Sequence, residues 1–514
     1  MPTTRSARTS CLLIIALFLV IFFWRPDYDA SPNSSYEDSI AQSSSHLNQS
    51  YASPVVPAKP VESEKPIEPV KPIETAKLPI AHPDMCRKSL DFLDLEEHAG
   101  NVVYSRQCIR AVPKRGLKPE STIDIGRPMF DTAYTLDTSA EDCALPICNE
   151  PFEVYYPETS HKPSENASSL LFGAATSMER LDRAFPFMQR WLAGTGSTLV
   201  VIVTDNSSAS ELQAMEQKAG AVGVQFTLLS QRDFGGEQDP TALHFKVVQA
   251  LSQHRQPHHD WFGIIDDDTF FTSLSALLDA VKPYDPEGRW YLGALSESWY
   301  QVSIFGMMAY GGAGIFLSGP VLEALHTNLD VCTGTDTGDR LFMSCLYNTV
   351  SPPVQLTILP GLNQMDIDEP VDGWYENGRK PVLSLHHYDG WAHVPVHLGH
   401  EVTGICGHDC FLQRYRFADD VVLTNGFSAV RYPQGLAQID LGKTEATFVN
   451  SDDLDGYAPS LGQLRPKLSP EEKVSWRMEH AVKSEDGRVR QFYIRRRDVD
   501  GAEEINVLEI DWSA

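Results

Sequence analysis

The chain has 514 residues and a formal net charge of −27 at pH 7, from 42 basic and 69 acidic residues. This length suffices for one large domain or two, with additional segments. A strongly acidic chain excludes nucleic acid as an expected partner, because a polyanion is repelled unless a local basic surface attracts it. The nearest basic cluster, the three arginines at 495–497, is more typical of a solvated strand face.

An apolar run at residues 11–24 predicts a signal-anchor membrane segment. Arg5 and Arg8 precede it and acidic residues follow it, which places residues 1–10 in the cytoplasm and the rest of the chain in a lumen. At about 1.5 Å per residue the run spans roughly 21 Å, which suits the thinner bilayers of the early secretory pathway. The alternative is a cleaved signal peptide, but no typical small-residue cleavage site follows closely.

Two further features agree with a lumenal location. Eight cysteines lie outside the apolar run, and an even number predicts disulfides in an oxidising compartment. Sequence does not give their connectivity; proximity favours Cys332 with Cys345 and Cys406 with Cys410. Four Asn-x-Ser sequons are candidate N-glycosylation sites: Asn33, Asn48, Asn166 and Asn206.

The next two segments carry no catalytic pattern. Residues 25–84 are rich in Pro, Ser, Glu and Lys, which predicts an extended stem. A ligand for a proline-recognising module is the alternative. Residues 85–165 hold four cysteines and little periodicity, so we expect a disulfide-tied N-terminal extension.

A regular alternation of strands and helices extends over residues 166–405. Apolar residues at helical spacing separate the expected strands, which lie at 170–175, 198–203, 224–229 and 261–265. Such alternation implies right-handed crossovers and a mostly parallel sheet, the α/β class.

Three adjacent aspartates, Asp266, Asp267 and Asp268, follow the last of these strands. Their charges repel one another unless a cation or water shares them. Other Asp-x-Asp triplets in the chain are typical of solvated turns; this one differs because a buried strand delivers it to an edge where open α/β sheets bind ligands. A divalent metal with a bound pyrophosphate would share the charge, which predicts a metal-dependent sugar transferase using a nucleotide-sugar donor.

Later motifs extend this pattern. Glycines at 311, 312 and 314 precede an apolar strand at 315–317, and glycine lets a backbone approach a ligand closely, although a plain turn is the alternative. Asp339 begins a helical stripe and could serve only as its N-terminal cap. The histidines at 386 and 387 end a short strand.

Taken together, these motifs resemble the Fringe-like β-1,3-glycosyltransferases, a superfamily that includes Fringe and the core-1 β-1,3-galactosyltransferases. Five motifs match in order and rough spacing over residues 168–392: those at 266–271, 290–293, 311–314, 338–339 and 384–387. The resemblance implies a GT-A fold, with a Rossmann-like, mostly parallel sheet flanked by helices, and a UDP-sugar donor.

The resemblance also implies a metal site. Asp268 would be a metal ligand, and Asp266 would contact the nucleotide or metal-bound water. His386 would complete the site, with His387 as the alternative. Oxygen ligands with one imidazole suit Mn²⁺ better than zinc; Mg²⁺ is the alternative ion.

Asp339 is the candidate general base by the same resemblance, although Gly338 stands where several relatives have Glu. Asp336 and Glu376 are the alternatives for that role. The expected nucleotide-sugar contacts are Arg180, Asp205, Asp266, Asp267, Gly311 and Gly312.

The expected function is an inverting glycosyltransferase of the Golgi, a single-pass type II membrane protein with a lumenal catalytic domain. It would move a hexose or N-acetylhexosamine from a UDP-sugar to a glycan or glycoprotein hydroxyl, forming a β-1,3 linkage. One alternative is a zinc metallohydrolase using the histidines and cysteines between 386 and 410, whose spacing fits no strong zinc pattern. The other is a glycan-binding module that has lost turnover.

Residues 406–514 show short alternating stretches, which predict a small β-rich C-terminal appendage. The stretches at 489–494 and 505–512 flank a turn sequence at 498–501 and predict a hairpin. We expect this appendage to cover a sheet edge rather than to bind acceptor.

Overall fold

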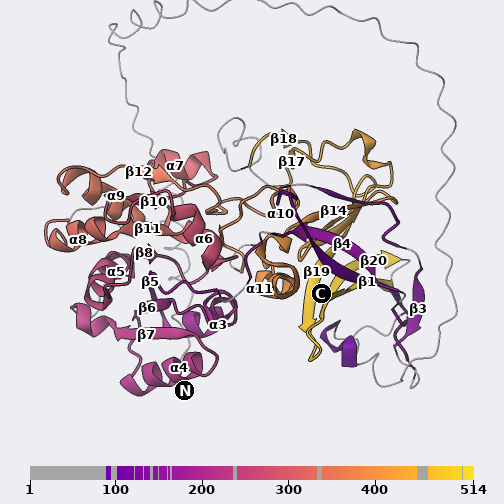
Figure 1. Cartoon of the computed structure of the whole chain (residues 1–514), viewed down its shortest axis with the longest axis horizontal. Coiled ribbons are helices and arrows are strands. Elements are labelled where there is room, and N and C mark those ends of the chain that lie inside the picture. Colours follow the sequence, from indigo (N-terminus) through magenta and orange to yellow (C-terminus); the bar gives the residue numbers. More distant parts are fainter. Residues whose placement is uncertain are drawn as a thin grey trace, which may run out of the picture. The chain divides into compact units, whose positions relative to one another are not determined.

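Figure 1 shows the computed structural model of the chain. The structure describes residues 88–93, 101–235, 240–332, 338–389, 392–448, 461–499 and 502–514, apart from isolated positions and pairs between 121 and 164. The expected cytoplasmic tail, anchor and stem, with Asn33, Asn48 and Asp336, lie outside these ranges. Within the ranges, no helix has both the length and the apolar character that a membrane span requires.

A seven-stranded sheet forms the centre of the expected α/β region (Figure 1). Four strands, β5 to β8, run parallel, while β11 is antiparallel to both of its neighbours and β10 is parallel to β12. From edge to edge the sheet contains β12 (Leu356–Ile358), β10 (Tyr291–Gly293), β11 (Ile315–Ser318), β8 (Trp261–Ile264), β5 (Leu170–Thr176), β6 (Thr198–Val203) and β7 (Gln225–Ser230). The α/β class with a mixed, mostly parallel sheet is confirmed.

Helices cover both faces of this sheet. Because its strands are buried on both sides, they are continuously apolar, as β5 and β8 illustrate. One core contains the apolar stripes of α3 (Met178–Leu192), α4 (Ala209–Gly220) and α6 (Leu274–Val281). The other contains those of α5 (Pro240–His254), α8 (Gly319–Thr327) and α9 (Gly338–Asn348).

A second, ten-stranded sheet unites two segments that the sequence analysis treats separately. Strand β1 of the N-terminal extension pairs in parallel with β21 at the C-terminus, from Val102 with Ile505 to Arg110 with Ser513. An apolar edge of the C-terminal strands is thereby covered by β1, which the sequence alone could not assign because its partner is about 400 residues away. The C-terminal region is β-rich as expected, and β20 and β21 form the expected hairpin.

The path of this sheet is β2 (Ile123–Ile125), β14 (Arg414–Phe417), β15 (Val421–Thr424), β16 (Ser428–Arg431), β19 (Val474–Lys483), β20 (Val489–Val499), β21 (Ala502–Ser513), β1 (Asn101–Lys114) and β3 (Tyr134–Asp137), with β4 (Phe152–Pro157) also on β1. Two short pairs are β9 (Phe270–Phe271) with β13 (Ser384–Leu385), and β17 (Thr444–Glu445) with β18 (Leu464–Arg465). Short helices are α7 (Trp299–Phe305), α10 (Asp372–Tyr375), α11 (Val396–Gly399) and α12 (Thr403–Cys406). The 3-10 turns are η1 (Asp91–Leu93), η2 (Gln231–Phe234), η3 (Gly311–Ala313), η4 (His400–Val402), η5 (His408–Cys410) and η6 (Leu436–Gln438).

Disulfides form where the sequence analysis expected local pairs. Cys332 is bonded to Cys345 and Cys406 to Cys410, so both expected pairs are confirmed. A third bond joins Cys108 of β1 to Cys148. The sequon residues Asn166 and Asn206 are exposed, which leaves both accessible for glycosylation.

Candidate active site

The acidic triplet forms the turn that follows β8. The amide N–H of Asp266 donates to Thr269 Oγ1 at 3.1 Å, and the Thr269 hydroxyl donates to the carbonyl of Gly312 at 2.9 Å. Thr269 is fully buried, so both bonds lie in a low-dielectric setting where a lost partner is costly. The turn is therefore fixed against the glycine-rich segment that precedes β11.

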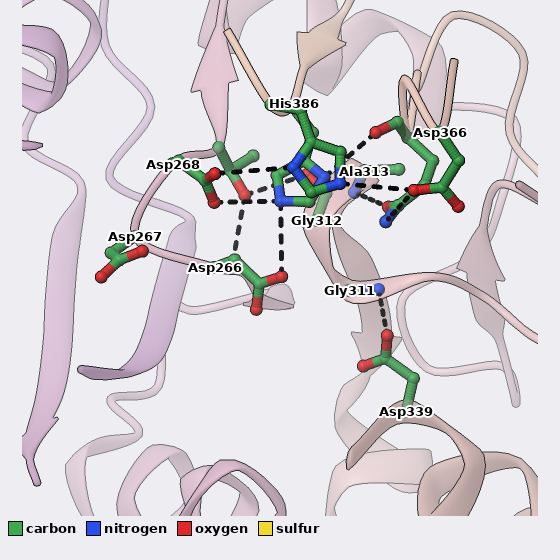
Figure 2. A network of polar contacts seen from close by, with 12 residues as sticks. Asp266, Asp267, Asp268, Gly311, Gly312, Ala313, Asp339, Asp366 and His386 are labelled. Atoms are coloured by element: carbon green, nitrogen blue, oxygen red, sulfur yellow. Dashed lines mark hydrogen bonds and ion pairs between the residues drawn. The ribbon is translucent and has the colours of Figure 1, made fainter. Parts of the chain in front are cut away.

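Asp268 and His386 meet because β9 pairs with β13. Phe271 lies opposite Ser384 and Phe270 opposite Leu385, which brings the residues just outside the ladder together. Asp268 Oδ1 lies 2.9 Å from His386 Nε2 (Figure 2). Two segments more than a hundred residues apart thus contribute to one polar cluster.

The second histidine of the pair also faces the cluster. His387 Nδ1 lies 3.8 Å from Asp268 Oδ2, and its Nε2 lies 3.3 Å from Asp366 Oδ1. His387 has a φ of 53°, in the left-handed region that non-glycine residues adopt only when the surroundings compensate. This backbone turn lets two consecutive imidazoles contact one carboxylate.

The tautomer of His386 is set by its other nitrogen. Nδ1 lies 3.0 Å from the carbonyl oxygen of Gln364, an acceptor, so Nδ1 carries a hydrogen. Burial alone would lower the pKa of His386, but the hydrogen bond with Asp268 and the charges of Asp268 and Asp266 raise that pKa to about 9. Nε2 therefore faces carboxylates that attract a cation.

The residues present fit a hard divalent cation. Ligand atoms of Asp268, His386 and His387 all lie within 4.8 Å of one another, and Asp266 Oδ2 lies 3.6 Å from His386 Nε2. A β-carbon at Gly312 would lie 2.2 Å from ring atoms of His386, so only glycine leaves room for the imidazole at this position. Carboxylate oxygens with imidazole nitrogen are a donor set that Mn²⁺ accepts.

The middle aspartate has a different environment. Asp267 is buried, and Arg180 Nε donates to its Oδ2 at 2.5 Å, while Thr176 also donates to that oxygen. Figure 2 shows its carboxylate on the far side of the turn from His386. Asp267 therefore orients Arg180, and any contact of Asp267 with a nucleotide stays a prediction.

A cavity of about 740 Å³ adjoins the triplet and is of a size typical of ligand sites. It is lined by the end of β5, Thr204 just after β6, one face of α3 and the segment 386–389, and its two arginines are Arg180 and Arg183. Asp205 follows the lining residue Thr204 in sequence and accepts hydrogen bonds from the amides of Met178, at 2.7 Å, and Ser207, at 3.0 Å. Asp205 thus fixes the entry to α3, and its predicted nucleotide contact is not tested.

Asp339 lies at the start of α9, near the triplet. Its Oδ2 accepts from the amide of Gly311 at 2.6 Å (Figure 2), and its Oδ1 lies 3.0 Å from His244 Nε2. His244, from α5, also places Nδ1 3.9 Å from Asp266 Oδ1. Sequence analysis missed His244, whose only signal was an imidazole one position from the apolar stripe at Leu243 and Val247.

Two alternatives to this cluster were Glu376 as the general base and a zinc site at residues 386–410. Glu376 is buried between Lys473, whose Nζ lies 2.7 Å from it, and the hydroxyl of Ser428, so its pairing is structural and the structure does not bring it to the cluster. Cys406 and Cys410 are bonded to each other, which removes the thiolates that a zinc site at 386–410 would need. Among the described residues, no cluster with metal-ligand geometry uses this histidine and cysteine region beyond His386 and His387.

Two family models match parts of this chain. The Fringe-like family model matches residues 235–345, which contain the acidic triplet, the glycine-rich segment and Asp339. This segment is similar to the Fringe-like family. A second family model, described as a protein of unknown function, DUF604, matches residues 301–398 and so includes His386. The expected resemblance to the Fringe-like family is confirmed over residues 235–345.

Comparison with solved structures gives weaker likenesses. The mannosyltransferase PcManGT from Pyrobaculum calidifontis, in complex with GDP-Man and Mn²⁺, aligns at 12% identity over 43% of this chain and 63% of that chain, with a TM-score of 0.26. A glycosyltransferase involved in glycosylation of the PBCV-1 major capsid aligns at 14% identity over 42% of this chain and 92% of that chain, with a TM-score of 0.26. Apo mouse xyloside xylosyltransferase 1 aligns at 11% identity over 37% of this chain and 84% of that chain, also with a TM-score of 0.26. No curated protein sequence matches.

Gly312 offers a direct test of the cluster formed by Asp268 and His386. In Gly312→Ala the new methyl group would displace the His386 ring, so we expect Mn²⁺ affinity, measured by isothermal titration calorimetry, to fall at least about 10-fold, the range seen when ligand orientation is lost. Gly220→Ala, where nothing lies within 4 Å of the added carbon, is the matched control. Unchanged Mn²⁺ affinity in Gly312→Ala would remove His386 from the proposed ligand set.

A buried acid behind the cluster predicts a pH effect on stability. Glu297 is 1% exposed and accepts from the amide of Asp366 at 3.2 Å. Burial and the charge of Asp366 raise the pKa of Glu297 to about 7, so the folded protein binds a proton that the unfolded chain releases near its ordinary pKa. The contribution of Glu297 to the free energy of unfolding is therefore fully present below pH about 4.5. This contribution is lost as the pH rises through about 7.

We expect the free energy of unfolding of Glu297→Gln, measured by urea denaturation, to exceed that of wild type by about 3 kcal/mol at pH 8. At pH 5 we expect the difference to be less than about 1 kcal/mol. Glutamine retains an oxygen for the Asp366 amide, so the comparison isolates the charge. The exposed residue Glu287, changed to Gln, is the control and should show no such pH dependence. An equal difference at both pH values would contradict the prediction.

Proposed function

We propose that this protein is an inverting glycosyltransferase that moves a hexose or N-acetylhexosamine from a UDP-sugar to a glycan or glycoprotein hydroxyl, forming a β-1,3 linkage. The observation that carries the proposal is the pairing of Asp268 with His386 across β9 and β13, beside a cavity containing Arg180. The Fringe-like match over residues 235–345 supports the enzyme class.

Asp268, His386 and Asp266 would hold a divalent ion, Mn²⁺ or alternatively Mg²⁺. When bound, such an ion supplies charge neutralisation for a diphosphate leaving group. Arg180, oriented by Asp267, presents a half-exposed guanidinium to the cavity and suits a phosphate or uridine oxygen. Because Gly312 has no β-carbon, it leaves room for the His386 ring.

Asp339 would accept the proton of the acceptor hydroxyl. As that oxygen bonds to C1 of the sugar, the bond between C1 and the diphosphate oxygen breaks, and the proton moves to the carboxylate. One displacement converts an α-linked donor into a β-linked product. The Gly311 amide and His244 hold the carboxylate on both oxygens, which restricts its orientation.

We further propose a Golgi location with an N-terminal membrane anchor at residues 11–24. The Asn-x-Ser sequons and the three disulfides that join two described cysteines support passage through an oxidising secretory compartment. Immunolocalisation of the full chain with a Golgi marker, and protease protection of its C-terminus in sealed microsomes, test this placement. A C-terminus digested without detergent would contradict it.

The decisive assay screens the full chain, in detergent, against UDP-galactose, UDP-glucose, UDP-N-acetylglucosamine and UDP-N-acetylgalactosamine with Mn²⁺. We expect Mn²⁺-dependent UDP release from at least one donor, and NMR of the product formed on a glycan array should identify a β-1,3 linkage. Binding of UDP-sugars without turnover would favour the glycan-binding alternative.

A further inference from the structure

His387 has no part in the ligand set of the proposed function, although its ring faces the same carboxylate as His386. Its Nδ1 lies 3.8 Å from Asp268 Oδ2, whereas His386 Nε2 lies 2.9 Å from Asp268 Oδ1. The centroids of the two imidazoles are 3.6 Å apart. A separation of 3.8 Å is too long for a hydrogen bond, so a hydrogen bond with Asp268 does not explain why His387 turns toward this carboxylate.

The opposite nitrogen of His387 faces a buried carboxylate. Nε2 lies 3.3 Å from Asp366 Oδ1, and the Asp366 side chain is only 7% exposed. An ionised carboxylate only accepts, so Nε2 carries a hydrogen, and in the neutral imidazole Nδ1 then carries the lone pair. His386 has the reverse arrangement, with its hydrogen on Nδ1 toward the Gln364 carbonyl and its lone pair on Nε2. In both rings the lone pair is therefore on the nitrogen that faces Asp268.

Asp366 and His386 share a partner, Gln364. Oδ1 of Asp366 accepts from Gln364 Nε2 at 3.4 Å, while the Gln364 carbonyl oxygen lies 3.0 Å from His386 Nδ1. Figure 2 shows Asp366 on the other side of His386 from Asp268. A carboxylate behind a metal-binding imidazole fixes the tautomer of the ring and raises the basicity of the nitrogen that binds the ion. Asp366 has this position relative to His387.

The backbone at His387 is a second, independent observation. Its φ of 53° lies in the left-handed region, which residues other than glycine adopt uncommonly. In an extended strand, consecutive side chains point to opposite faces, so an extended chain beyond β13 would turn His387 away from His386. The left-handed conformation instead lets both imidazoles face Asp268, and an unfavourable conformation of this kind is typical of functional sites.

We propose that His386 and His387 both bind the divalent ion, and that Asp366 orients His387 for this purpose. Ligand atoms of Asp268, His386 and His387 all lie within 4.8 Å of one another, which lets one ion contact all three residues. The inference rests on the proposed metal-dependent transferase, to which it adds a second nitrogen ligand and a positioning residue. Mg²⁺ is a hard cation that takes oxygen ligands, so a site with two imidazoles prefers Mn²⁺.

Pulsed electron paramagnetic resonance of Mn²⁺ bound to the full chain tests the number of nitrogen ligands. We expect spin-echo envelope modulation from two imidazole nitrogens in wild type and from one in His387→Asn. Asparagine tolerates a left-handed φ, so this variant removes the imidazole with little change of the backbone. His393→Asn is the matched control, because exposed His393 also has a positive φ, of 44°. Modulation from one nitrogen in wild type, or from two in His387→Asn, would overturn the inference.

Asp366→Asn tests the positioning role. Asparagine retains an oxygen for the Gln364 amide but removes the charge behind His387. Loss of such a partner lowers metal affinity about 10- to 100-fold, so we expect the Kd for Mn²⁺, measured by isothermal titration calorimetry without UDP-sugar, to rise by that factor. Asp368→Asn removes an exposed charge two positions later and should leave this Kd unchanged. Equal Kd values in Asp366→Asn and wild type would exclude the role of Asp366.

Ion preference gives a further readout on the same variants. The ratio of the Kd for Mg²⁺ to the Kd for Mn²⁺ should fall in His387→Asn, because the remaining ligands are richer in oxygen. An unchanged ratio would contradict a second imidazole ligand. Thermal unfolding without Mn²⁺ verifies that each variant is folded, and the nitrogen count in wild type decides the question even if His387→Asn does not fold.

These measurements need neither donor nor acceptor, so they separate the inference from the proposed function. Two coupled nitrogens in a protein that releases no UDP from any donor would support the two-histidine site and refute the transferase. One coupled nitrogen together with Mn²⁺-dependent UDP release would refute the second ligand alone. Absence of Mn²⁺ binding to wild type would refute both the inference and the metal site of the proposed function.

Discussion

Asp268→Ala should abolish metal-dependent turnover of UDP-sugars. Its two carboxylate oxygens contact both histidines, at 2.9 Å from His386 and 3.8 Å from His387, so its removal takes away the acid that joins the two strand ends. Burial would raise the pKa of Asp268, but these histidines hold it far below its usual range, which keeps the carboxylate charged at every physiological pH. We expect UDP release with saturating Mn²⁺ to fall below about 0.1% of wild type, as when electrostatic stabilisation of a leaving group is lost.

Asp260→Ala is the matched control for this substitution. Asp260 is exposed and immediately precedes β8, whereas the triplet follows the other end of the same strand. Its removal tests the general effect of losing one negative charge from an acidic chain. Retention of more than about a tenth of wild-type turnover in Asp268→Ala would exclude an essential role of Asp268 in holding a metal.

The second large effect is expected for Asp339→Asn. A general base contributes about 100- to 10,000-fold to rate, so we expect kcat to fall by that factor while the KM for the donor changes little. The amide would keep one acceptor oxygen for either the Gly311 amide or His244, which limits the structural disturbance. Wild-type kcat in a folded Asp339→Asn protein would remove Asp339 from this role.

His244 gives a way to test whether Asp339 acts as part of a unit. If His244 works by orienting Asp339, His244→Gln combined with Asp339→Asn should be no slower than Asp339→Asn alone, because the oriented group is already absent. Fully additive losses would show that His244 acts independently of Asp339. The premise of this double-mutant cycle is the 3.0 Å contact between His244 Nε2 and Asp339 Oδ1.

The local parts of the fold are largely predictable from sequence. The expected strands at 170–175, 198–203 and 224–229 correspond to β5, β6 and β7 to within a few residues, because apolar periodicity and alternating helices are local signals. The disulfides Cys332–Cys345 and Cys406–Cys410 could be guessed because their cysteines are only 13 and 4 residues apart. Cys108–Cys148, whose cysteines are 40 positions apart, could not be guessed in this way.

The pairing of strands that are far apart in the chain could not be predicted from the sequence. The parallel pairing of β1 with β21 joins residues about 400 apart, and no periodicity in either strand specifies which other strand it meets. As a result, the N-terminal extension and the C-terminal strands were predicted as separate parts, whereas one ten-stranded sheet contains both. Register of this kind depends on matching buried faces across the whole domain.

By itself, the sequence determined the α/β pattern, the placement of an acidic triplet after a buried strand, and a Fringe-like order of motifs. Each of these features depends on residues that are close together in the chain. Only the tertiary structure decided that Asp268 faces the histidines while Asp267 turns to Arg180, and that His244 links Asp266 with Asp339. The physical reason is that side-chain partners are selected by the turn after β8 and by the packing of α5 and α9, which bring together atoms from segments far apart in the chain.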